Sequence, residues 1–195
     1  MKRYLTIIAA LILMSLPAAA QTLGLSYSPL GKASVKLPEG VNYYSSSLAG
    51  GVTYEFLTNG DSIMLEGVYS VYSYDTFVSS GESIVPSSTE NMTLMSLMGY
   101  YGWTINKGKR VQFPLYAGLG ICSFEQSPGP EIALSAGVKA RAKFYITNRF
   151  GLFAGANASL GIFALAKEGS NEASLYSYRP MSVEFGVMFD LLDKK

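Results

Sequence analysis

The chain has 195 residues, with 15 Lys or Arg against 14 Asp or Glu, so its formal net charge is only +1. This balance gives no indication of nucleic-acid binding, and a single cysteine excludes an internal disulfide. Charged residues make up 15% of the chain, below the ~25% usual for soluble domains, while aromatic residues make up 13% and include fourteen tyrosines.

The first twenty residues predict a cleaved signal peptide. Lys2 and Arg3 give a basic start, the run Tyr4–Leu16 is apolar, and three alanines precede Gln21. Because a helix that spans a membrane needs ~20 apolar residues, this shorter run favours cleavage over anchoring. Residues 21–195 then fit a single domain by length.

Segments with strand character alternate with turn signals along the rest of the chain. We expect strands at Gln21–Ser28, Ser47–Leu57, Ser62–Tyr74, Met92–Thr104, Val111–Phe124, Glu131–Thr147, Phe150–Leu165 and Ser177–Asp190. That makes eight, and an even number is usual for single-chain bacterial membrane barrels.

The alternation is clearest in Glu131–Thr147. Every second residue from Ile132 to Ile146 is apolar, and the intervening positions include Lys139, Arg141 and Lys143. A helix would distribute these three cations over different faces, whereas a strand places all of them on one face. This pattern is therefore typical of a strand with one apolar and one polar face.

The expected connections alternate between short and long. The short ones are residues 58–61, 106–109 and 148–149, and the long ones are residues 29–46, 75–91, 125–130 and 166–176. Outer-membrane barrels have short periplasmic turns and longer external loops. A signal peptide would leave the new N-terminus in the periplasm, so the first long connection would be external, as this pattern requires.

The sequence thus predicts an all-β fold, an eight-stranded antiparallel up-and-down transmembrane β-barrel in the outer membrane, with both termini in the periplasm and lipid against its apolar face. Two alternatives remain. In a soluble β-sandwich the apolar faces would be half solvated, and they are too continuous for that. A membrane helix over residues 151–166 would be short for a span and would contain three glycines.

If the apolar faces meet lipid, the other faces line the bore. The inward set then contains three acids and three bases: Glu55, Glu66, Glu184, Lys139, Arg141 and Lys143. Charges in a narrow, poorly hydrated interior are costly unless they are paired. We therefore expect a lumenal ion-pair network that closes the bore. The alternative is that some of these side chains are solvated at the rims, where a pair contributes only ~0–1 kcal/mol.

The chain contains no histidine. This removes the commonest general base, histidine metal sites and hydrolases of the Ser-His type. We expect no enzymatic activity, no cofactor and no metal site, and we expect Cys122 to be a small packed thiol.

Three stretches of sequence carry a resemblance to a known family. Val111–Gly120 after a short turn, Lys139–Phe144 and Phe150–Ala154 resemble the small outer-membrane barrels of the OmpA-type transmembrane domain, particularly the Bacteroidota-style barrels related to PorT. The inward charges are similar to the charged plug of OmpA-type barrels, which implies a structural or gated-pore role.

The leading functional hypothesis is a non-enzymatic outer-membrane barrel with a structural or surface-interaction role. Its partners would be outer-membrane lipid and envelope or extracellular proteins, contacted through the Ser- and Tyr-rich loops 29–46 and 75–91. Idle solvated loops fit this composition equally well. A narrow gated pore, and an accessory subunit of a secretion or conjugation machine, are the alternatives.

Overall fold

The computed structural model describes residues 21–37, 40–58, 61–79, 82–84, 91–126, 129–166 and 173–191. The expected signal peptide lies outside the described residues. The strands are β1 (Gln21–Leu37), β2 (Gly40–Thr58), β3 (Asp61–Ser79), β4 (Glu82–Ile84), β5 (Met92–Ile105), β6 (Val111–Gln126), β7 (Gly129–Tyr145), β8 (Phe150–Ala166) and β9 (Ala173–Asp190). In these residues, no helix is long and apolar enough to cross a membrane.

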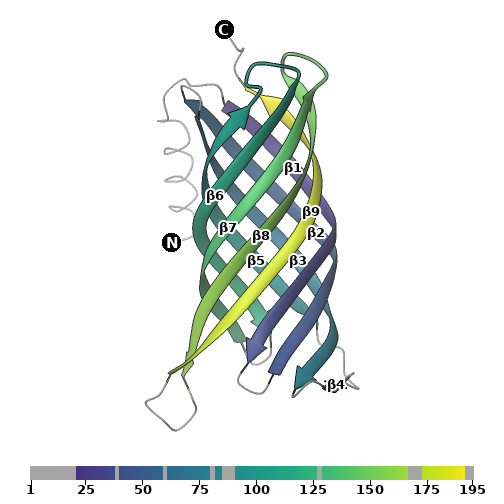
Figure 1. The fold of residues 1–195 in the computed structure, drawn as a ribbon, viewed down its shortest axis with the longest axis vertical. Coiled ribbons are helices and arrows are strands. Elements are labelled where there is room, and N and C mark those ends of the chain that lie inside the picture. The colour runs from purple at the N-terminus through teal and green to yellow at the C-terminus, as the bar shows by residue number, and fades with distance from the viewer. Residues whose placement is uncertain are drawn as a thin grey trace.

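The eight long strands form a closed antiparallel ring in the order β1-β2-β3-β5-β6-β7-β8-β9. The ring closes because β9 pairs with β1, for example at Thr22 and Asp190. The short β4 pairs with the end of β3 and adds nothing to the ring. Figure 1 shows the tilted strands wrapping around one axis. The predicted all-β, up-and-down barrel is confirmed.

One end of the barrel has short turns. The β5–β6 turn contains Asn106 and Gly108 with positive φ values of 59° and 76°, a conformation that asparagine and glycine tolerate best. The backbone N–H of Leu191 donates to the carbonyl of Gln21 at 2.8 Å. Both described ends of the chain therefore lie at this end, which we call the short-turn end.

The opposite end, which we call the hairpin end, differs from the expectation. The range 29–46 is not a loop, because β1 continues to Leu37 and β2 begins at Gly40. The alternation persists through this range: Ala33 and Val35 are buried while Lys32 is exposed. The pattern is hard to recognise in the sequence because the outward positions include lysines and serines, which are also common in loops.

The prediction of a simple loop over residues 75–91 is also wrong. β3 continues to Ser79, and β4 follows at Glu82–Ile84. The extension forms because the lengthened β2 supplies pairing partners, such as Val41 for Val78. Residues 80–81 and 85–90 lie outside the described part.

The outer surface of the ring is apolar along most of its length. On β7, for example, Ile132 and Leu134 are 71% and 73% exposed, and Val138 and Phe144 are exposed as well. Leucines, valines and aromatic residues occupy outward positions on the other long strands too. Such a large exposed apolar surface indicates a non-aqueous environment or a partner. We call this surface the apolar belt.

Candidate functional site: the charge network inside the barrel

Three cations from one strand lie inside the barrel. Lys139, Arg141 and Lys143 occupy alternate positions of β7, so they share its inner face. None is more than 4% exposed. Charges this deeply buried require partners, because their desolvation is otherwise uncompensated.

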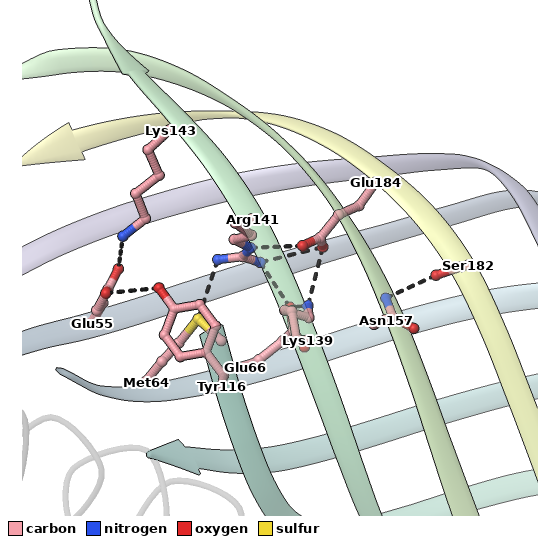
Figure 2. A network of polar contacts seen from close by, with 10 residues as sticks. All are labelled: Glu55, Met64, Glu66, Tyr116, Lys139, Arg141, Lys143, Asn157, Ser182 and Glu184. Atoms are coloured by element: carbon pink, nitrogen blue, oxygen red, sulfur yellow. Dashed lines mark hydrogen bonds and ion pairs between the residues drawn. The ribbon is translucent and has the colours of Figure 1, made fainter. Parts of the chain in front are cut away.

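The partners come from three other strands. Glu55 lies on β2, Glu66 on β3 and Glu184 on β9, and each is only 2% exposed. In the ring order, β2 stands opposite β7, so long side chains meet near the middle of the bore. Figure 2 shows these side chains pointing toward one another from the different strands.

Four of the six charges form one cluster. Arg141 binds Glu184 through two nitrogens: Nε lies 2.6 Å from Oε1 and Nη2 lies 3.2 Å from Oε2. The same Nη2 is 3.1 Å from Glu66 Oε1. Lys139 Nζ pairs with Glu66 and lies 3.1 Å from Glu184 Oε2. We call this group the four-charge cluster, in which each acid contacts both bases.

A second, smaller group lies toward the short-turn end. Lys143 Nζ pairs with Glu55 Oε2, and the hydroxyl of Tyr116 donates to Glu55 Oε1 at 2.9 Å. Between the two groups, Arg141 Nη1 lies 3.1 Å from the sulfur of Met64. Met64 is the strand partner of Glu55, so the Glu55–Lys143 pair lies next to the four-charge cluster, and we call the two groups together the charge network.

Aromatic rings pack against the cations of this network. The guanidinium carbon of Arg141 lies 4.3 Å from the ring centroid of Phe153, and Lys139 Nζ lies 5.7 Å from that of Tyr100. Both distances lie within the range of cation–π attraction. The rings also exclude water from the ion pairs, which strengthens their electrostatic interaction.

A glycine makes the central ion pair possible. Gly155 on β8 is the strand neighbour of both Arg141 and Glu184. A Cβ atom at this position would lie 2.9 Å from Arg141 Cγ and 3.0 Å from Glu184 Oε1. The missing side chain therefore leaves the space in which these two residues meet across β8.

A fourth buried acid, Asp190, is not among the inward charges predicted from the sequence. It is fully buried near the short-turn end, and Thr22 Oγ1 donates to its Oδ1 at 2.6 Å. Asp190 has the same parity as Glu184 on β9, so the alternation could have identified it. Asp190 is the last residue of β9, where a charged side chain is expected to be solvated at the rim.

At the hairpin end, the bore is filled by apolar side chains. The hairpin-end apolar cluster consists of Ala33, Val35, Tyr44, Tyr72, Met92, Leu94, Cys122, Ala133 and Tyr178, all buried. Tyr44 packs edge-on against Tyr74 with ring centroids 5.2 Å apart. The sequence does not predict this cluster, because three of its nine members, Ala33, Val35 and Tyr44, lie in the range expected to be a loop and the other six lie near the ends of different strands.

A small polar cavity of about 50 Å³ separates the charge network from the hairpin-end apolar cluster. Its lining includes Glu66, Glu184 and the serines Ser26, Ser28, Ser70, Ser96, Ser135, Ser159 and Ser182. Asn157 Nδ2 donates to Ser182 Oγ at 2.8 Å there (Figure 2). With ~10–15 Å³ needed per water, this space accommodates a few molecules.

The structure thus brings together, in two adjacent groups, all six charged residues predicted to line the bore. Each base contacts at least one of the acids, and none of the six is exposed. Within the described residues, no group of three or more His, Cys, Asp or Glu side chains could hold a metal ion. Chemically, the arrangement holds charge in place and fills space.

No family model matches the chain, and no curated protein matches its sequence. Its fold is similar to the crystal structure of Neisserial surface protein A, with a TM-score of 0.57 and 12% identity over 88% of this chain and 97% of that one. The attachment invasion locus protein Ail of Yersinia pestis also matches, at TM-score 0.42 and 13% identity, covering 88% and 99% of the two chains. At such identities the likeness concerns the fold alone.

The N-terminal β-barrel domain of Pseudomonas aeruginosa OprF matches at TM-score 0.41 and 21% identity, over 87% of this chain and 97% of that domain. The match with the Neisserial protein supports the barrel fold seen in the strand pairing. The more specific resemblance to PorT-related barrels stays a prediction.

Proposed function

We propose that this protein is a non-enzymatic outer-membrane barrel with a closed bore and a structural or surface-interaction role. The apolar belt supports the membrane location, because a transmembrane strand needs ~9–11 residues and the outward apolar positions of β9 run from Met181 to Phe189. The short turns and both described ends share one end of the barrel, as expected for the periplasmic side.

The observation that carries the closed bore is that two different obstructions lie in series. The charge network occupies the middle of the barrel, and the hairpin-end apolar cluster fills the bore beyond the serine-lined cavity. In eight-stranded barrels the interior is just wide enough to be filled by side chains. Rearranging the ion pairs alone would therefore leave the apolar obstruction in place.

The surface role rests on the hairpin end. The β1–β2 hairpin extends beyond the apolar belt and presents ordered strands where loop 29–46 was expected. Contact with protein partners through residues 29–46 and 75–91 would then involve residues of the strands β1, β2 and β3 in place of loop residues. The structural neighbour in Neisseria is named a surface protein, which is consistent with this role. An accessory role in a secretion or conjugation machine is a narrower version of the same proposal.

Planar-bilayer recordings test the closed bore. We expect no channel events from the wild type or from Glu66→Gln, because the hairpin-end apolar cluster remains. Glu66→Gln combined with Tyr72→Ala and Tyr178→Ala removes parts of both obstructions and should give discrete conductance steps. Channel events in the wild type would contradict the proposal and favour the narrow gated pore.

A further inference from the structure

Three exposed cations lie on the outer face of the barrel, directly beyond the apolar belt. They are Lys32 and Lys36 on β1 and Arg179 on β9, and we call them the basic triad. On β9 the outward positions are apolar across Met181–Phe189, and the next outward residue is Arg179. On β1 the large outward side chains across Leu23–Leu30 are apolar, and the next is Lys32.

The strand register brings the triad together. Ser34 is the partner of Arg179, and Lys32 and Lys36 lie two residues on either side of Ser34. Because paired residues point to the same face of a sheet, Arg179 lies diagonally between the two lysines. Such diagonal neighbours are ~7–8 Å apart, which is close enough for three side chains to engage one ligand.

The triad has no acidic partner in the described part of the chain. None of its members takes part in an ion pair there. The carboxylate of Asp75 on β3 accepts a hydrogen bond from Ser45 of β2, so β2 separates it from the triad. In the interior every lysine and arginine of the network meets a carboxylate, whereas the triad is exposed and available to an anion from outside the chain.

The position of the triad identifies the kind of anion. Lys and Arg at the edge of a hydrocarbon belt extend their charged ends into the headgroup layer, and a guanidinium matches a phosphate through two parallel hydrogen bonds. We propose that the basic triad binds the phosphate groups of a lipid headgroup in the membrane leaflet at the hairpin end. This site rests on the proposed function, since it requires the belt to lie in a membrane.

The test is a lipid titration of the purified full chain in neutral detergent, with bound lipid counted by native mass spectrometry. The probe is a bis-phosphorylated glycolipid of the lipid A type, and the comparison is its dephosphorylated form. The test variant combines Lys32→Gln, Lys36→Gln and Arg179→Gln. The control combines Lys107→Gln, Lys109→Gln and Arg110→Gln at the short-turn end, with the same change in charge.

We expect the triad variant to bind the phosphorylated lipid at least about tenfold more weakly than the wild type, while the control stays within about twofold. The dephosphorylated lipid should bind all three proteins weakly and equally. Arg179→Lys, which keeps the charge and removes the paired hydrogen bonds, should weaken binding by several-fold. A shift in gel mobility on heating shows that each variant is folded.

Equal losses in the triad variant and the control would overturn the site, because net charge alone would then explain the binding. The site would also be overturned if millimolar inorganic phosphate displaced the bound phosphorylated lipid as effectively as added unlabelled lipid does. Failure of the wild type to insert into phospholipid bilayers would instead overturn the proposed membrane function, and the detergent titration would distinguish the two results.

Discussion

At the scale of single residues, the network inside the barrel consists of charges that depend on one another. Lys143 lies deep in the bore with Glu55 as its ion-pair partner, and Arg141 contacts two carboxylates at once. Removing one member of such a buried pair leaves an uncompensated charge, whereas neutralising both members leaves no unpaired charge behind.

Lys143→Met should therefore lower the free energy of unfolding by about 3–5 kcal/mol, because Glu55 keeps only the hydrogen bond from Tyr116. The double variant Glu55→Gln with Lys143→Met should cost clearly less than the single one. Urea titration of the barrel in lipid vesicles measures both. Lys109→Met at an exposed turn is the control, expected within ~0.5 kcal/mol of the wild type. A single variant as stable as this control would refute the dependence.

Gly155→Ala should destabilise the barrel by about 1–3 kcal/mol through overpacking. Its Cβ would lie 2.7 Å from the carbonyl oxygen of Ala140 and 2.9 Å from Arg141 Cγ. Gly67→Ala is the matched control, because a Cβ there meets nothing within 4 Å. The same urea titration compares the two, and equal stability of both variants would show that Gly155 has no spacing role.

At the scale of strands, β7 combines the two features on which the proposed function rests, with cations on its inner face and apolar residues on its outer face. Val138 is near the middle of the outward row and is 59% exposed. In water, arginine at such a position would be almost neutral for stability. In hydrocarbon the same substitution lowers the free energy of unfolding, so its effect shows whether water or lipid surrounds the outer face of β7.

Val138→Arg should therefore cost about 2–4 kcal/mol in lipid vesicles, the value found for arginine on the lipid face near the bilayer midplane. Ser73→Arg, on the outward face of β3 beyond the belt, should cost less than ~1 kcal/mol. Unfolding titrations in vesicles provide the comparison. Equal and small effects at both positions would mean that Val138 faces water.

Strand alternation predicted the ring and the inward face of β7, because a period of two survives wherever one side is uniformly apolar. It did not predict that β1 continues past Ser28 to Leu37 or that β2 begins as early as Gly40. The reason is that Lys32, Lys36 and the neighbouring serines are residue types common in loops. Their strand character depends on pairing with each other and on the burial of Val35, which a single sequence does not display.

The six charges of the network could be selected from parity, but their pairing could not. Which carboxylate meets Arg141 depends on the stagger between distant strands and on the space at Gly155. The hairpin-end apolar cluster was missed for a related reason: Tyr44, Tyr72 and Tyr178 come from three strands and meet only once the ring is closed.

At the scale of the whole molecule, the barrel separates two environments across one layer of backbone. Leu152 and Phe153 are consecutive on β8, yet the first is 42% exposed on the belt and the second is 5% exposed beside Arg141. As proposed, hydrocarbon lies on one side and a bore closed to bulk water lies on the other.

The most direct test places a single tryptophan at each of these two positions, in a chain whose native tryptophan is replaced by Trp103→Phe, and reconstitutes the barrels in vesicles. We predict that brominated acyl chains quench the fluorescence of Leu152→Trp strongly and that of Phe153→Trp only weakly, and that aqueous iodide quenches neither. Equal quenching of the two by brominated lipid, or strong quenching of Phe153→Trp by iodide, would contradict the account.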